Sequence, residues 1–217
     1  LASMGVYAFR ASVLEDLLMK NRKWVDFGKE LIPNSLGAHR VFAHMFSGYW
    51  EDIGTVRSYF DASMEMTLPN PPFEFHNPKH LFFTHARALP GVIIESVCMT
   101  NCIICGGSRI AKGTISNSIL GIRSIVKAGV ELNRCILLGA EHYEDDSPRS
   151  CKIPLGIGEN SKIENAIIDH NARIGKNVVI RGHDKLPDFE CEQYVVRDGI
   201  VIVFKNAVIP DGTVIGQ

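Results

Sequence analysis

The second half of the chain repeats aliphatic residues at intervals of six. A helix would space them by three and four, and a hairpin strand would alternate them with polar residues. A period of six is typical of a parallel β-helix, in which short strands end at corners and three strands make one coil. We therefore predict a β-helix over residues 92–217, with the repeated side chains stacked inside. The runs are Leu120, Val126, Leu132 and Leu138; Ile157 and Ile163; and Ile168, Ile174 and Ile180.

Residues 1–66 lack this period and are predicted to form one α/β unit. Helical spacing is present over Ala11–Lys20, and residues 58–68 resume it. Asp26 is placed to cap a short helix that Pro33 would stop. Strands are predicted at residues 4–9 and 40–47. Two strands and three helices leave apolar faces uncovered, and the chain begins at Leu1, so we expect part of a longer protein.

Residues 67–91 are predicted to be an extended linker, because five prolines interrupt them. Two polar inserts are expected to leave the β-helix at corners, residues 141–152 with four acidic residues and residues 183–193. Long inserts of this kind are often functional.

Composition adds few constraints. The chain has 217 residues, 46% of them hydrophobic, and a formal charge of −1. A charge this close to zero gives no reason to expect nucleic acid or an anionic membrane as a partner. No apolar run approaches the ~20 residues that cross a bilayer. We expect a cytoplasmic protein, or a plastid protein if the source is a plant or alga.

The six cysteines are interpreted as reduced thiols. Cys98, Cys102 and Cys105 cluster, which suggests a metal site, but no histidine lies at zinc-finger spacing nearby. Small thiols also fill β-helix interiors as modest hydrophobes, and this is the interpretation that we favour.

Asp52 is the main candidate for chemistry. It follows an apolar segment in a Tyr-Trp-Glu-Asp-Ile-Gly-Thr stretch that ends at Thr55. A carboxylate beyond a strand end can hold Mg²⁺, which in turn grips phosphate oxygens. The alternatives are a helix N-cap or a surface acid. Ser3 and Asp26 could likewise bind sugar oxygens, although a plain N-cap explains Asp26 equally well.

Six segments in this order resemble glucose-1-phosphate adenylyltransferases over the full chain, corresponding to the C-terminal half of such an enzyme. They are residues 1–7 (LASMGVY), 26–33 (DFGKELIP), 49–55 (YWEDIGT), 121–124 (GIRS), 154–158 (PLGIG) and 168–175 (IDHNARIG). The resemblance implies the C-terminal part of a Rossmann-like nucleotidyltransferase domain, then a left-handed parallel β-helix. It also implies a tetramer, homomeric or heteromeric.

The resemblance further implies that ATP and glucose 1-phosphate give ADP-glucose and pyrophosphate with Mg²⁺, for glycogen or starch synthesis. Asp52 would be a metal ligand and in that role a catalytic residue, and Ser3, Asp26 and Trp50 would line the glucosyl pocket. The nucleotide loop and a second metal acid would lie outside this chain, so we expect the chain alone to be inactive.

A phosphorylated effector, or phosphate, is implied to bind at Arg123, His170 and Lys205. The resemblance implies lysine at the position of His170, so this chain departs from the pattern there. Arg123 and Lys205 could also be ordinary solvated residues of the β-helix.

Two other functions stay open. The chain could belong to a non-catalytic regulatory subunit of the same hetero-oligomer. A hexapeptide acyltransferase would instead use a loop histidine, such as His142 or His170.

Overall fold

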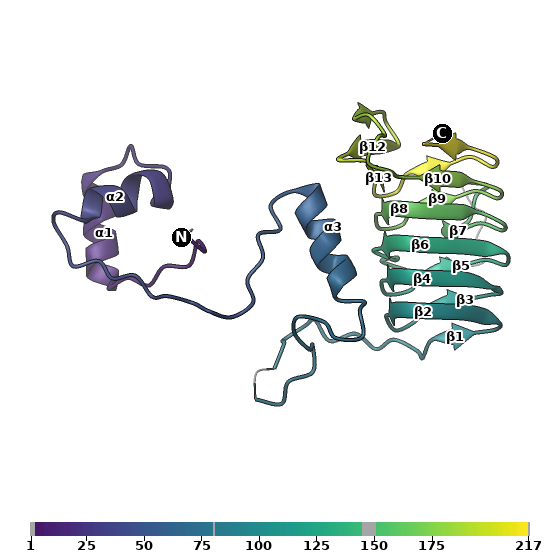
Figure 1. The fold of residues 1–217 in the computed structure, drawn as a ribbon, viewed down its shortest axis with the longest axis horizontal. Coiled ribbons are helices and arrows are strands. Elements are labelled where there is room, and N and C mark those ends of the chain that lie inside the picture. Colours follow the sequence, from purple (N-terminus) through teal and green to yellow (C-terminus); the bar gives the residue numbers. More distant parts are fainter. Residues whose placement is uncertain (1–2, 80, 145–150, 217) are drawn as a thin grey trace. The chain divides into compact units, whose positions relative to one another are not determined.

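The computed structural model describes residues 3–79, 81–144 and 151–216 (Figure 1). The chain divides into two compact units, residues 1–50 and residues 51–217. Within the described part of the chain, no helix is both long and apolar enough to cross a membrane.

The first unit is built from short helices. They are α1 (Ala11–Lys20), the π-helical turn η1 (Phe27–Leu31) and α2 (Ile32–Ser35). Leu17 and Leu31 are its buried apolar side chains. The helix over Ala11–Lys20 is as predicted.

Two predictions for this unit are wrong. The described residues 3–50 contain no strand, because neither residues 4–9 nor residues 40–47 have a neighbouring strand to pair with. Pro33 does not stop the short helix. It lies in the first turn of α2, where a missing backbone N–H costs little, and the helix continues to Ser35.

The second unit begins with α3 (Val56–Glu65), which starts two residues earlier and ends three residues earlier than predicted. Thr55 caps it: the Thr55 hydroxyl accepts from the Ser58 backbone N–H, and the Ser58 side chain accepts from that of Thr55. Between α3 and the β-helix, the described residues of the 67–91 segment form no helix or strand.

The β-helix contains two sheets of stacked strands, mostly parallel. The short-stranded sheet is β1 (Ile93–Ile94), β3 (Arg109–Ile110), β5 (Ile125–Val126), β7 (Gly156–Ile157), β9 (Arg173–Ile174) and β14 (Val208–Ile209). The other sheet includes β2 (Val97–Ile104), β4 (Gly113–Leu120), β6 (Val130–Leu137), β8 (Lys162–Ile168) and β13 (Ile200–Val203). Strands β10 (Val179–Arg181) and β15 (Val214–Ile215) pair with each other, and β10 also pairs with β8.

The insert at residues 183–193 forms an antiparallel excursion from this stack. It carries β11 (Phe189–Glu190), which pairs with β12 (Tyr194–Arg197), and β12 pairs antiparallel with β13. The chain then rejoins the β-helix, because β13 pairs parallel with β8.

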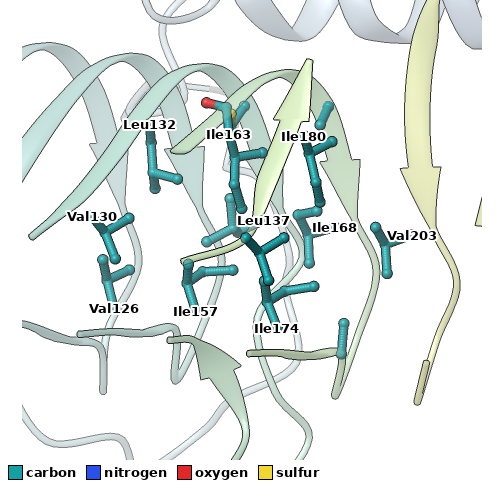
Figure 2. Packing of buried hydrophobic residues seen from close by; sticks show 14 of the residues in the cluster. Val126, Val130, Leu132, Leu137, Ile157, Ile163, Ile168, Ile174, Ile180 and Val203 are labelled. Atoms are coloured by element: carbon teal, nitrogen blue, oxygen red, sulfur yellow. The ribbon is translucent and has the colours of Figure 1, made fainter. Parts of the chain in front are cut away.

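The period-six side chains stack inside the β-helix, as predicted (Figure 2). Val126 pairs with Ile157, which pairs with Ile174, and all three are at most 3% exposed. Leu138 is the exception. Leu120 pairs with Leu137, so this coil is one residue shorter than the period and Leu137 takes the interior place.

The helix α3 packs on the outside of this β-helix. Phe60 is fully buried and Met64 is 5% exposed, and both join a cluster with Ile136, Ile167 and Ile200 from β6, β8 and β13. Leu138 also packs against this cluster. Since Asp52 lies four residues before α3, the helix attaches the Asp52 loop to the β-helix.

The close stacking of corners yields a test of the fold. Gly139 has φ +89°, and a Cβ there would lie 2.0 Å from the Ile122 carbonyl oxygen, whereas Gly212 has φ +72° and open space around it. Both alanine variants should incur about 1–2 kcal/mol of left-handed strain. Gly139→Ala should lower the free energy of unfolding by at least ~2 kcal/mol more than Gly212→Ala, because its Cβ would also clash with the Ile122 carbonyl oxygen. Its melting temperature should be lower than that of Gly212→Ala by roughly 5 °C. Equal melting temperatures for the two variants would contradict the tight corner stacking.

Candidate functional site

Ser3 and Asp26 are both placed near the phenol of Tyr7 in the first unit. The Ser3 Oγ and the Tyr7 hydroxyl are 3.0 Å apart. A Cβ added to Gly28 would lie 3.5 Å from both the Tyr7 hydroxyl and the Asp26 Oδ1, so these two oxygens flank the same small space. The structure therefore gathers a serine hydroxyl, a phenol and a carboxylate around Gly28.

Local structure holds this group in place. The Tyr7 ring stacks on Phe27 at 6.1 Å between ring centroids and lies 6.4 Å from Phe9. Asp26 caps η1 as predicted, since its Oδ1 accepts from the Lys29 backbone N–H at 2.6 Å. The cap leaves this carboxylate fixed beside Tyr7. Tyr7 is not among the residues predicted from the sequence, although it ends the same segment that contains Ser3.

Asp52 is an exposed carboxylate at the start of the second unit. Its Oδ1 accepts from the Gly54 backbone N–H at 3.0 Å, which closes a turn directly before α3. The N-cap of α3 is Thr55, so the alternative that Asp52 caps this helix is wrong. Trp50, which is 42% exposed, is the last residue of the first unit.

Asp52 by itself offers one carboxylate to a metal ion. Among the described residues, no group of three or more His, Cys, Asp or Glu side chains is placed to hold a metal. Mg²⁺ is suited to such a donor, because it keeps several waters and is often bound through one or two carboxylates plus substrate phosphates. The oxygen donor of Asp52 therefore fits Mg²⁺, with the remaining ligands supplied from elsewhere.

All six cysteines are free. Cys135 is buried in the β-helix, where its Sγ donates to the Ile163 carbonyl at 3.2 Å, and burial raises the pKa of its thiol to about 12. Cys102 is partly buried against the same core. Cys98 differs from the expected interior role, because its position in β2 leaves it exposed.

Arg123, His170 and Lys205 lie on one corner of the β-helix. Backbone hydrogen bonds stack the turns that contain them: Arg123 N–H to Gly106, Ala140 N–H to Ile122, Asn171 N–H to Gly139, and Asn206 N–H to His170. Arg123, Asn171 and Asn206 all have a left-handed backbone, with φ of 55°, 60° and 62°. The stacked turns therefore place three residues that are far apart in sequence along one corner.

Glu141, at the start of the first insert, contacts Lys205 on this corner. Its Oε1 is 2.6 Å from the Lys205 Nζ, and its Oε2 accepts from the Asn171 side chain at 2.9 Å. The hydrogen bond from Lys205, then that from Asn171, lowers the pKa of Glu141, and the charge of His170 contributes in the same direction. Glu141 thus joins Lys205 and His170 in one electrostatic group.

The other members of the corner are also engaged. The His170 Nδ1 is 3.1 Å from the Asp169 Oδ1. The Arg123 guanidinium lies 5.6 Å from the centre of the Tyr143 ring and donates to the Ala140 carbonyl. These three side chains contact the first insert or neighbouring turns, and Lys205 keeps 46% of its side chain exposed.

Comparison with known proteins adds family information. A family model described as the GLGC left-handed parallel beta-helix domain matches residues 87–214, and one described as nucleotidyl transferase matches residues 1–68. The chain is 43% identical over 223 residues to glucose-1-phosphate adenylyltransferase large subunit 1, chloroplastic/amyloplastic, of Zea mays. This similarity covers 99% of the chain and 43% of the length of the maize protein.

The contact between Lys205 and Glu141 can be tested by titration. Lys205→Ala removes the largest cause of the lowered pKa of Glu141, so that pKa should rise toward its ordinary value. Carbon-13 NMR of the Glu141 carboxyl measures it. Because the folded pKa is lowered, the contact stabilises the fold above the unfolded pKa, and this contribution is lost as the pH falls through the folded pKa.

Lys176→Ala is the matched control, because it removes a different exposed ion pair, with Glu159 at 2.9 Å. It should leave the Glu141 titration unchanged. An unchanged Glu141 pKa in Lys205→Ala would show that the two side chains do not interact.

Proposed function

We propose that this chain, which belongs to the family of the GLGC left-handed parallel beta-helix domain, is part of a glucose-1-phosphate adenylyltransferase. The reaction joins ATP and glucose 1-phosphate to give ADP-glucose and pyrophosphate. The observation that carries the proposal is the order of two matched domains, nucleotidyl transferase and then β-helix, along one chain. The chain spans less than half of the maize relative, so the rest of the site is expected in the other part of such an enzyme.

The group around Gly28 supports a sugar-binding role. A sugar presents several hydroxyls that both donate and accept, and the Ser3 hydroxyl, the Tyr7 phenol and the Asp26 carboxylate are matching partners. Trp50 adds an indole face that suits the apolar side of a pyranose ring. We assign these four residues to the glucosyl part of the substrate.

Asp52 is proposed to hold Mg²⁺. When bound, the ion would neutralise charge on the phosphates of ATP and glucose 1-phosphate. In the reaction, a phosphate oxygen of glucose 1-phosphate forms a bond to the α-phosphorus of ATP, and the bond to the pyrophosphate oxygen breaks. This chemistry depends on alignment and charge neutralisation. The turn closed by Gly54 supports the role of Asp52, because it orients the carboxylate.

The corner that carries Arg123, His170 and Lys205 is proposed to bind phosphate or a phosphorylated effector. A planar guanidinium and an ammonium together suit a phosphate group. The stacked turns support this assignment, since they gather the three residues on one surface.

A second candidate function is a non-catalytic regulatory subunit. The maize relative is named a large subunit, which favours assembly with a different subunit. Either role fits a tetramer, and the relative's chloroplastic/amyloplastic name supports a plastid location. The acyltransferase alternative gains no support, because the match to the GLGC domain covers residues 87–214, which include His142 and His170.

Asp52→Asn tests the catalytic proposal in an enzyme that contains this chain with the rest of its nucleotidyltransferase domain. The substitution keeps the shape and removes the charge. Turnover at saturating substrate should fall by at least ~100-fold, because charge stabilisation at the phosphates is lost. Pyrophosphate release measures the rate.

Asp16→Asn serves as the control, since it neutralises an exposed aspartate that pairs with Lys20 on the surface of α1. It should retain full turnover. Near-normal turnover of Asp52→Asn at saturating Mg²⁺ would refute the catalytic assignment and favour the regulatory subunit.

His170→Lys tests the effector proposal. A lysine at this position would carry a fixed positive charge, so His170→Lys should bind the effector more tightly than the natural chain. The His170 Nδ1 lies 3.1 Å from the Asp169 Oδ1, and Lys205 contacts Glu141 on the same corner.

The measurement is the effector concentration that gives half-maximal response at neutral pH. Identical half-maximal concentrations for the two proteins would place His170 outside the effector site.

A further inference from the structure

The long strands of the β-helix bend in the middle at residues with a left-handed backbone. In β2, β4 and β8 this residue is asparagine: Asn101, Asn117 and Asn165 have φ of 53°, 46° and 47°. Asparagine tolerates this conformation better than most residues. Its side chain can also form a hydrogen bond to the equivalent asparagine of the next coil. The side-chain amide of Asn101 donates to the Asn117 Oδ1 at 3.1 Å.

In strand β6 the equivalent residue is Arg134, with φ of 52°, so an arginine interrupts the column of asparagines. An arginine gains nothing from the left-handed conformation and is strained there. The backbone conformation at this position therefore does not explain why it is an arginine. The contacts of the Arg134 side chain do.

The Arg134 side chain reaches from the β-helix to α3. Its guanidinium carbon lies 5.4 Å from the centre of the Phe60 ring, and its Nη2 lies 3.6 Å from the Asp61 Oδ1. Its Nε donates to the Asn165 Oδ1 at 2.9 Å, so the next coil orients the guanidinium. Arg134 thus binds two consecutive residues of α3 while it stays anchored in the asparagine column.

A movement of α3 would be transmitted to Asp52 through very few residues. Thr55 caps the helix, and the turn between Asp52 and Gly54 comes immediately before it. At the same end of the helix, Arg57 donates to the Asp184 carboxylate at 3.1 Å and also to the Asp198 carbonyl. The contacts of Arg57 therefore hold the start of α3, next to the Asp52 loop, against the second unit.

We propose that Arg134 is a positioning residue for the adenylyl transfer: it fixes α3 on the β-helix and thereby holds the carboxylate of Asp52 in place. This inference rests on the proposed function of Asp52 as the acid that holds Mg²⁺. It also gives a physical route by which a change in the β-helix reaches Asp52. The route runs through the Arg134 side chain on β6 and then through the first turns of α3.

Arg134→Asn is the decisive variant, because asparagine is the residue at the equivalent position of β2, β4 and β8. It removes the contacts to Phe60 and Asp61 and relieves the left-handed strain, so the β-helix should keep or raise its melting temperature. Amide hydrogen exchange in α3 should accelerate by about 10-fold, as expected for the loss of a stacked, charged contact. Exchange in the β-helix strands should stay the same.

The functional readout is the Mg²⁺ concentration that gives half-maximal turnover, in the enzyme that contains this chain. It should rise roughly 3- to 10-fold in Arg134→Asn, because a less restrained Asp52 holds the ion less well. Arg134→Lys keeps the charge but not the planar group, and its values should lie between those of the natural chain and Arg134→Asn.

Lys162→Asn is the matched control. Lys162 is an exposed cation on the neighbouring strand β8, and it pairs with Glu131 of β6 at 2.9 Å. It should change neither the exchange of α3 nor the Mg²⁺ requirement.

The outcomes separate this inference from the proposed function. If Asp52→Asn abolishes turnover while Arg134→Asn leaves both α3 exchange and the Mg²⁺ requirement unchanged, the positioning role is overturned. If Arg134→Asn accelerates exchange throughout the β-helix strands, Arg134 supports the fold in general and the inference is also overturned. If Asp52→Asn retains turnover, the proposed function itself fails, whatever Arg134 does.

Discussion

Each coil of the β-helix must reverse direction within a few residues while it keeps one aliphatic side chain per face in the interior. The turns satisfy this constraint with left-handed backbone, as at Arg123, Asn171 and Asn206, and with backbones in close contact, as at Gly139. Because successive coils stack in register, residues at equivalent turns form columns on the outside. The interior packing thereby determines which surface residues meet, including the cations proposed to bind an effector.

The same register creates the platform for α3. Ile136, Ile167 and Ile200 point outward from three strands, although each adjoins an inward-pointing neighbour, and they bury Phe60 and Met64. Burying a side chain of this size contributes about 1.5–3 kcal/mol. The apolar contact supplies the attraction, and the polar contacts of Arg57 and Arg134 set where the helix lies. Asp52 therefore belongs mechanically to the β-helix unit.

Periodic and local signals could be read from the sequence, whereas pairing and register could not. The stacked isoleucines, the helix over Ala11–Lys20 and the Asp26 cap follow from short-range patterns. The prediction of strands at residues 4–9 and 40–47 is wrong, because a strand needs a neighbouring strand to pair with and a local pattern does not show whether one is present. The position of Leu138 outside the core depends on the length of its coil, and the contacts of Arg134 depend on a helix that is distant in sequence. Tyr7 can be recognised as a candidate site residue only once the fold places it beside Asp26. The six segments suggested the site residues through resemblance, and their roles stay predictions.

The charge balance at the corner bears on how an effector would act there. Lys205 already contacts Glu141, and His170 contacts Asp169, so the proposed phosphate ligand would have to compete with carboxylates of the chain itself. Contacts this exposed are weak, because water screens them. A ligand with more than one negative charge would therefore be able to displace them. Glu141 also begins the insert at residues 141–152, so exchanging its carboxylate for a phosphate would change the contact that ties this insert to the corner.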